Sequence, residues 1–492
     1  MSAHHQLSEA IRSAVNTAHA DSLLSVAAPE TITLERPKNR DHGDYATSIA
    51  LVLAKAAGKP PREIAEIVVK ALSGNPTIEK LEIAGPGFIN ITLAKASQGA
   101  VVSSILNQKE KFGLGTSLKG IKINLEFISA NPTGPLHLGH TRWAAVGDAL
   151  GRTLTAAGAE VTREFYVNDR GVQMDLFGES IRASALGIAR PESGYQGAYI
   201  DDLAKQIKSE RPDFVSLPEK ESIVAFREAG YALQLKQQQD VLERFGTHFD
   251  VWFSERSMHE KDAIAKAMKQ LKAQGHVFEH EGATWLRTTD FGDDKDRVLI
   301  KSDGELTYFS SDTAYYVNKR DRGFDICIYM LGADHHGYVG RLKATAACAG
   351  DNPDYNIEVM IGQLVKIMEG GEEVKLSKRA GTIITLEDLV EKVGVDAARY
   401  TLIRYPVNTP MVLDVDLLKK RTNDNPVYYV QYAHARIVAL LRNAAEYKIP
   451  VGLAVYQPEL LVHERERELL GALAEYPIIV ESAATMREPH RI

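Results

Sequence analysis

The sequence predicts an α/β protein built on a doubly wound parallel sheet, with a small α/β domain before the sheet and helices after it. Residues 121–128 alternate apolar and polar side chains like a strand, and residues 140–157 carry an apolar stripe with helical spacing. A loop rich in Pro and Gly separates them, and residues 160–167 form a second strand pattern. Strand, loop, helix and strand are the opening unit of a doubly wound sheet.

Composition places the chain among ordinary soluble globular proteins. It has 492 residues, 44% hydrophobic and 25% charged residues, and a formal net charge of −7. At about 150 residues per domain, this length indicates about three domains. We find no run of about 18 apolar residues and no secretory signal, so we expect no membrane span and a cytoplasmic protein. The two cysteines, Cys327 and Cys348, lie in apolar surroundings and are expected to be buried thiols.

We expect an N-terminal α/β domain over residues 1–95, a sheet domain over 115–410 and a helical domain over 417–492. In the first, a helix should begin near Tyr45 and a strand pair should flank Gly85-Pro86-Gly87. The segment 175–296 is polar and without clear strands, and is interpreted as an insertion. A further strand is expected over 306–309 and a helix over 312–320.

The strongest chemical signal is the loop 129–140, Ser-Ala-Asn-Pro-Thr-Gly-Pro-Leu-His-Leu-Gly-His. Ligands of parallel sheets bind outside the carboxyl ends of the strands, and a helix N-terminus suits phosphate. His137 and His140 are one turn apart, and Gly139 permits close approach of a planar base. The loop therefore predicts nucleotide binding, with imidazoles stabilising charge on a phosphate. The two histidines could instead be metal ligands or structural residues.

The second signal is residues 374–381, Val-Lys-Leu-Ser-Lys-Arg-Ala-Gly. Ammonium groups on a flexible loop can reach a polyphosphate and neutralise the charge of its transition state. Lys375 and Lys378 are the candidates for this role. A solvated charged loop is the alternative for this segment taken alone.

Together the two segments resemble the two signature sequences of class I aminoacyl-tRNA synthetases, the second of which is usually written KMSKS. The resemblance is closer to one family, the bacterial-type arginyl-tRNA synthetases. It covers essentially the whole chain and includes residues 40–47, 85–90, 126–140, 165–171, 331–337 and 425–436. It implies a class I synthetase doubly wound, Rossmann-like catalytic domain with an α/β N-terminal domain and an all-α anticodon-binding domain.

The resemblance implies that ATP and L-arginine form arginyl-adenylate, and that arginine is then attached to its tRNA. It makes His137, His140, Lys375 and Lys378 catalytic, with Mg²⁺ carried by ATP sharing the phosphate charge. The implied ATP-binding residues are these four with Gly139, Gly332, Asp334 and Ser377. The implied arginine-binding residues are Glu126, Asn131, Tyr308, Asp312 and His335. A carboxylate suits a guanidinium because it accepts two parallel hydrogen bonds, and Asp312 is the best candidate. For Asp312 alone, a helix N-cap is the alternative.

The implied tRNA-binding residues are Phe88, Asn90, Tyr428, Gln431 and Arg436. A core phenylalanine, a turn asparagine and tyrosines buried between helices are equally compatible with the sequence. The resemblance further implies that the protein is a monomer and that it needs tRNA to activate arginine, as is usual in this family. The helical domain is shorter than is usual in the family, and we expect it to be incomplete at its C-terminus.

Two other classes stay open at this stage. Asp334-His335-His336 resembles the signature of metal-dependent DHH phosphoesterases, although no matching set of acidic metal ligands is evident. The chain could also be a non-catalytic RNA-binding relative of the synthetases. Such relatives usually lose signature histidines or lysines, and here all four are present.

Overall fold

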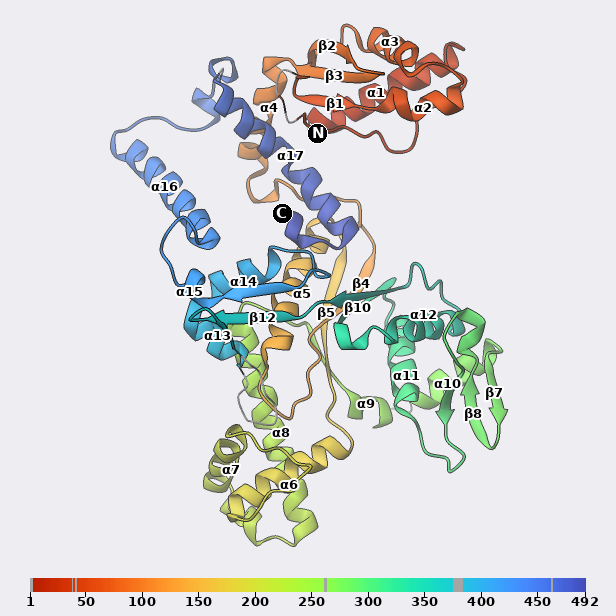
Figure 1. Cartoon of the computed structure of the whole chain (residues 1–492), viewed down its shortest axis with the longest axis vertical. Helices are drawn as coiled ribbons and strands as arrows, with labels where there is room; N and C mark the ends of the chain where they lie inside the picture. Colours follow the sequence, from red (N-terminus) through yellow and green to blue (C-terminus); the bar gives the residue numbers. More distant parts are fainter. Residues whose placement is uncertain (1–2, 38, 40–41, 261–262, 375–383, 462) are drawn as a thin grey trace. The chain divides into compact units, whose positions relative to one another are not determined.

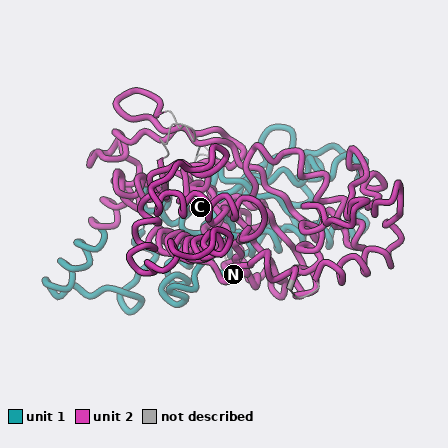
Figure 2. Tube along the Cα trace, turned by 90° about the horizontal axis from the view of Figure 1, so that it is seen from below, with its two compact units in different colours: residues 1–114, 437–480 teal, residues 115–436, 481–492 magenta. Residues whose placement is uncertain are grey.

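The computed structural model describes residues 3–37, 39, 42–260, 263–374, 384–461 and 463–492. The chain divides into two compact units, which Figure 2 colours separately. One unit comprises residues 1–114 and 437–480, and the other comprises residues 115–436 and 481–492.

The first unit contains a three-stranded antiparallel sheet with the strand order β1 (Tyr45–Thr47), β3 (Phe88–Leu93), β2 (Ile78–Ala84). Its helices in the N-terminal segment are α1 (Ala3–Ala20), α2 (Ile49–Ala57), α3 (Pro61–Leu72) and α4 (Lys95–Gln108) (Figure 1). The predicted hairpin between β2 and β3 is confirmed. The predicted helix start at Tyr45 is wrong, because Tyr45 begins a strand that pairs with Ile91 and the helix begins only at Ile49.

The second unit is built on a five-stranded parallel sheet, which confirms the predicted fold class. Its order is β11 (Ile357–Gly362), β10 (Ile326–Gly332), β4 (Lys122–Glu126), β5 (Glu160–Val167), β6 (Val251–Ser254). The helix α5 (Leu138–Ala156) connects β4 to β5 as expected. Because β5 lies on one side of β4 and β10 on the other, the strand order reverses at β4. In such sheets the ligand crevice lies at this reversal, outside the carboxyl ends of the strands.

Between β5 and β10 the chain forms more strands than the sequence predicted. It begins with helices α6 (Val172–Leu186), α7 (Tyr199–Glu210) and α8 (Glu219–Arg244), whose apolar faces share one core. Strand β6 then joins the parallel sheet at its edge, and α9 (Glu255–Glu260) and α10 (Ala263–Ala273) follow. A separate antiparallel sheet contains β7 (Val277–His280), β8 (Ala283–Leu286) and β9 (Arg297–Ile300). The expectation that 175–296 lacks strands is therefore wrong, since strands of four residues are too short to show clear alternation.

The expected strand over 306–309 is also wrong. Thr307 is the N-cap of α11 (Tyr308–Asp321), and its hydroxyl accepts a hydrogen bond from the backbone of Ser310. The local sequence Leu-Thr-Tyr-Phe has high strand propensity, but the cap and the burial of the following helix decide the structure. Helix α12 (Tyr338–Cys348) follows β10.

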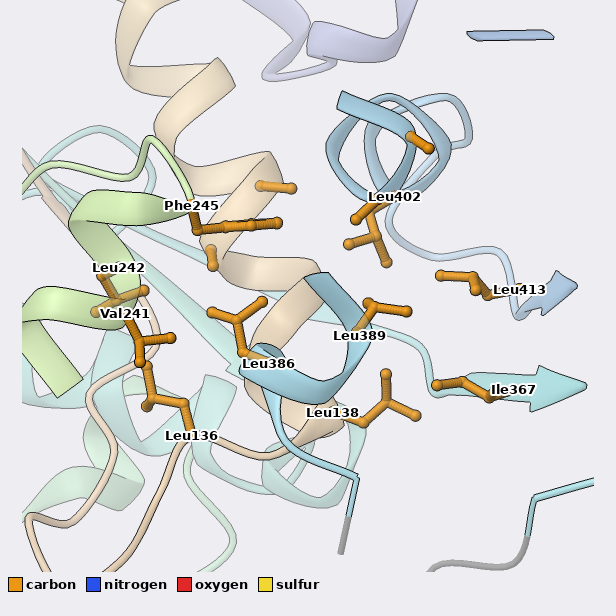
Figure 3. Close-up of a cluster of buried hydrophobic side chains, with 14 of the residues drawn as sticks. Leu136, Leu138, Val241, Leu242, Phe245, Ile367, Leu386, Leu389, Leu402 and Leu413 are labelled. Carbon is orange, nitrogen blue, oxygen red and sulfur yellow. The ribbon is translucent and has the colours of Figure 1, made fainter. Parts of the chain in front are cut away.

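The C-terminal half of the second unit packs beside the first signature loop. It contains β12 (Val365–Glu369), β13 (Glu372–Glu373), α13 (Leu386–Val393), α14 (Val395–Ile403), β14 (Met411–Asp414) and α15 (Val415–Leu418). Figure 3 shows the shared core, in which Leu136 and Leu138 of the loop lie among side chains of α8, α13, β12 and β14. This core fixes the ends of the loop that carries the predicted histidines.

From residue 417 the described chain is helical, as predicted, with α16 (Pro426–Glu446), α17 (Glu464–Met486) and short 3₁₀ turns. Length and composition alone make α17 a candidate membrane span, with a mean hydropathy of 1.2 over a window that is 22% buried. This is weak support for a span, because core helices of soluble proteins pass the same test. Cys327 and Cys348 are buried free thiols, as predicted.

Candidate active site

The candidate site begins at a strained corner where β4 ends. Ile128 and Ser129 have φ angles of +69° and +45°, and a positive φ is a genuine outlier for a β-branched residue. The Ser129 hydroxyl donates to Glu126 Oε1 at 3.0 Å and accepts from the backbone N–H of Tyr166 at 3.1 Å. Such backbone conformations persist only where the surroundings hold them, and they cluster at ligand-binding sites.

The two signature histidines lie together at the N-terminus of α5. The ring centroids of His137 and His140 are 3.8 Å apart, with 28° between the ring planes. His137 is the helix N-cap, and its Nδ1 accepts the backbone N–H of Gly139 at 3.1 Å. A Cβ at position 139 would lie 2.9 Å from the imidazole, so glycine permits this packing. Two imidazoles and a helix N-terminus together suit a phosphate.

Arg142 holds this end of α5 in place. Its guanidinium is 3% exposed and donates to the carbonyl oxygens of Gln363, Pro406 and Thr409 at 3.2, 2.8 and 2.9 Å. Gln363 lies in the loop that precedes β12, and Pro406 and Thr409 lie in the loop that precedes β14. The helix that carries the histidines is therefore tied to the second half of the sheet domain.

The predicted lysines Lys375 and Lys378, together with Ser377, lie outside the described residues. The two ends of their loop are described. On one side, the N–H of Val374 donates to Ile367 O at 2.9 Å. On the other side, residues 384–386 pair with the first signature: Leu138 N–H donates to Ile384 O at 3.1 Å, and Leu386 N–H donates to Leu136 O at 2.8 Å. The far end of the lysine loop is thus attached directly beside His137.

A capping box follows this loop. The Thr385 hydroxyl accepts the N–H of Asp388 at 3.0 Å, and the Asp388 carboxylate accepts the N–H of Thr385 at 2.8 Å. The box fixes the start of α13 at the point where the lysine loop ends.

Acidic side chains gather at the carboxyl ends of β4 and β6 and on α11. Glu126 Oε2 accepts the ammonium of Lys319 at 2.5 Å, and Lys319 is fully buried. The same ammonium lies over the rings of Tyr315 and Tyr329, at 4.4 and 3.8 Å from their centroids. A buried charge pair of this kind holds the Glu126 carboxylate in one orientation.

Asp312 and Glu255 complete the acidic cluster. Burial, together with the charges of Glu255 and Glu126, raises the pKa of Asp312 to about 7, although Arg341 acts to lower it. Burial also raises the pKa of Glu255, whose carboxylate accepts the hydroxyl of Tyr166. No described residue forms a hydrogen bond or ion pair with the Asp312 carboxylate. Carboxylates with raised pKa values indicate a site that an organic cation would stabilise.

Asp312 is not a helix N-cap, because Thr307 caps α11 and Asp312 lies inside the helix. The remaining predicted arginine-binding residues are exposed or contact residues outside the cluster. Tyr308, one turn before Asp312, is 79% exposed. Asn131 Nδ2 donates to Gln173 at 2.7 Å, and the His335 ring lies 5.5 Å from that of Tyr338.

The predicted nucleoside-side residues follow β10. Gly332 is its last residue, and a Cβ there would lie 2.6 Å from Asp334 Oδ1, so glycine is needed for this contact. The side chain of Asp334 is 83% exposed and lies 3.6 Å from His335 Nε2. Both side chains are accessible at the carboxyl end of a strand that neighbours β4.

The predicted tRNA-binding residues lie on accessible elements. Phe88 is 39% exposed and Asn90 is partly exposed, both in β3, so neither the core phenylalanine nor the turn asparagine is correct. Gln431 Nε2 donates to Asp396 at 2.8 Å, and Arg436 donates to the hydroxyl of Tyr432 at 2.9 Å. Tyr428 is partly exposed and its ring stacks on that of Tyr432, so burial of this tyrosine between helices is also wrong.

Sequence reasoning missed Glu255, Tyr166 and Lys319. Glu255 directly follows β6, so the rule that ligands meet the carboxyl ends of strands would have indicated it had the short strand been recognised. Lys319 had no such signal, because a lysine on a helix is almost always exposed.

Comparison with known proteins decides the family. A family model described as tRNA synthetases class I (R), catalytic domain, matches residues 101–436, more than half of the chain. The chain belongs to the arginyl-tRNA synthetase family. Models described as the arginyl tRNA synthetase N terminal domain and the DALR anticodon binding domain match residues 5–93 and 430–492.

Curated relatives of this family match almost the whole chain. The arginine–tRNA ligase of Frankia alni is 53% identical over 99% of this chain and 88% of the relative. That of Paenarthrobacter aurescens is 51% identical over 99% and 87%. The solved Thermus thermophilus arginyl-tRNA synthetase, at 20% identity, supports the same fold with a TM-score of 0.75 over 99% of this chain and 89% of that one. The resemblance inferred from the two signatures is thereby confirmed, and the phosphoesterase alternative has no support.

Proposed function

We propose that the chain is an arginine–tRNA ligase. The arginine carboxylate attacks the α-phosphorus of ATP and pyrophosphate leaves, and the terminal ribose hydroxyl of tRNA then displaces AMP from the adenylate. The observation that carries this proposal is a domain that holds both a cluster of carboxylates suited to a cation and two histidines at a helix N-terminus, in a chain about half identical to named ligases.

The acidic cluster would select arginine. A guanidinium is planar and always charged, so it can donate two parallel hydrogen bonds to a carboxylate such as Asp312. Glu126 cannot move freely, because Lys319 holds it. Tyr308 would pack on the substrate side chain, and Asn131 and His335 would face its amino-acid end. Glu255 and Tyr166, which touch each other beside Asp312, join this set.

The histidines and the lysine loop would hold ATP. His137, Gly139 and His140 would meet the α-phosphate, and Lys375, Ser377 and Lys378 the pyrophosphate side. Gly332 and Asp334 would contact the nucleoside. Mg²⁺ arriving with ATP would supply additional positive charge at the phosphates.

Further parts of the proposal concern partners. Phe88 and Asn90, side by side on one face of β3, would contact an unpaired tRNA base. Tyr428, Gln431 and Arg436 of α16 would contact the anticodon arm. The bounds 1–95, 115–410 and 417–492 for the three domains, a monomeric state and a cytoplasmic location belong to the same proposal.

Exchange of labelled pyrophosphate into ATP tests the activation step. We expect exchange that depends on arginine and Mg²⁺, and also on tRNA, as the family resemblance implies. Exchange at full rate without tRNA would refute only the tRNA requirement. Manganese-dependent phosphodiester hydrolysis without any exchange would overturn the proposed function.

A further inference from the structure

A buried glutamine binds the backbone of the first signature loop. Gln238 of α8 is 1% exposed, and its Nε2 donates to two loop carbonyls, Asn131 O at 3.1 Å and Gly134 O at 2.8 Å. Both hydrogens of the amide are therefore used on the same short stretch of backbone. Along the chain, the two carbonyls lie between Glu126 of the acidic cluster and His137.

A tyrosine from a different helix holds the carbonyl between these two. The Tyr199 hydroxyl, on α7, donates to Thr133 O at 2.9 Å. Its ring end lies against Gly134, where a Cβ would meet the hydroxyl at 3.2 Å. Three carbonyls within four residues are thus bound by side chains of the helical insertion.

Helix α8 also contacts the start of α13, the helix that follows the lysine loop. Val241 and Leu242 share a core with Leu136 and Leu386 (Figure 3), and Arg244 forms an ion pair with Glu387 of α13. One helix therefore contacts both the first signature loop and the start of α13, which follows the lysine loop. A side chain on it that binds loop backbone can set the position of the histidines.

We infer that Gln238 is a positioning residue for amino-acid activation, with Tyr199 as its partner, and that the two fix the signature loop so that His137 and His140 meet the α-phosphate. This inference rests on the proposed function. Neither side chain need touch a substrate. Loosening the loop should slow the chemical step while leaving the carboxylates that bind arginine on β4, α9 and α11 in place.

The variants Gln238→Leu and Tyr199→Phe test the inference against Gln239→Leu, which changes the adjacent residue of α8. Gln239 forms no hydrogen bond with any described residue. We expect Gln238→Leu to lower the exchange kcat about tenfold to a hundredfold, since small misplacements cost this much. Tyr199→Phe should lower it less, and the control should match wild type. The arginine dissociation constant should change less than about twofold in Tyr199→Phe and in the control.

The pH dependence of a variant with a carboxyl at position 238 separates a positioning role of Gln238 from a purely structural one. Gln238→Glu places an ionised carboxylate against two carbonyls, and only its protonated form can donate. Its exchange rate relative to wild type should therefore rise as the pH is lowered from 8 to 6. Equal pH profiles for Gln238→Glu and wild type would overturn the inference.

Hydrogen exchange measured by mass spectrometry keeps the inference testable apart from activity. Amides of residues 133–140 should exchange faster in Gln238→Leu than in Gln239→Leu, with the rest of the sheet domain unchanged. Unchanged protection or an unchanged kcat in Gln238→Leu would overturn the inference. An inactive wild type with the expected change in protection would instead overturn the proposed function. If Gln238→Leu does not fold, Tyr199→Phe, which removes one oxygen atom, decides by the same criteria.

Discussion

Replacing Asp312 with Asn should abolish arginine binding and stabilise the empty protein at the same time. The carboxyl is largely buried without a described partner, and its pKa of about 7 lies well above the ordinary 3.8. An amide of the same shape has neither the negative charge nor the second acceptor oxygen that bidentate pairing with a guanidinium requires, but it also has no charge to desolvate. Activity and stability should therefore move in opposite directions.

The sign and size of the stability change follow from the pKa. The unfolded carboxyl ionises near pH 4, whereas the folded one keeps its proton to about pH 7, so the wild type loses stability as the pH rises through this window. At about 1.4 kcal/mol per pH unit the loss reaches at most about 4 kcal/mol above pH 7, and solvent around the partly exposed carboxylate reduces it. Asp312→Asn should recover it at pH 8 and gain nothing at pH 4.

Calorimetric titration of arginine and urea unfolding measure the two effects. In the wild type, arginine binding should weaken about tenfold from pH 8 to pH 6, because one carboxyl must lose its proton first. Asp321→Asn, at the exposed end of the same helix, is the control and should bind arginine normally. Unchanged arginine affinity in Asp312→Asn, or a loss of stability at pH 8, would refute the reasoning.

Three further predictions use the same contacts. Lys319→Met should lower the free energy of unfolding by about 3–5 kcal/mol, because it leaves Glu126 as an uncompensated buried charge. The control Lys266→Met breaks an exposed ion pair with Asp321 and should change the free energy of unfolding by less than about 1 kcal/mol. Equal effects of the two variants in urea unfolding would contradict this prediction. His140→Asn should lower the pyrophosphate-exchange kcat about a hundredfold with little change in arginine binding, and a normal rate would remove the imidazole from the chemistry. Thr385→Ala should cost about 1 kcal/mol of stability through loss of the capping box, and an unchanged urea midpoint would show that the core beneath α13 holds the helix start without it.

The sequence was sufficient where a pattern is long and local. Residues 121–167 showed β4, α5 and β5 because each strand has a clear alternating pattern and the helix between them has a clear apolar stripe, with a Pro/Gly-rich loop marking the boundary between β4 and α5. The pairing of 384–386 with the first signature was not predictable, since no local period encodes contact between distant segments.

The site was predictable in part for the same reason. His137, His140 and Asp312 were indicated by the loop pattern and the resemblance. Glu255 was missed because β6 has four residues, and the burial of Lys319 depends on two tyrosine rings and a carboxylate that only the fold brings together. Propensity was overridden at Tyr308, where a strand-like sequence begins a capped helix.

Attachment of labelled arginine to tRNA tests the central claim most directly. Wild-type protein with ATP, Mg²⁺ and tRNA should make acid-precipitable arginyl-tRNA, should not charge lysine or citrulline, and should lose the activity in Asp312→Asn. A folded preparation that binds arginine but attaches none to tRNA, or an Asp312→Asn variant that charges arginine at the wild-type rate, would contradict the account.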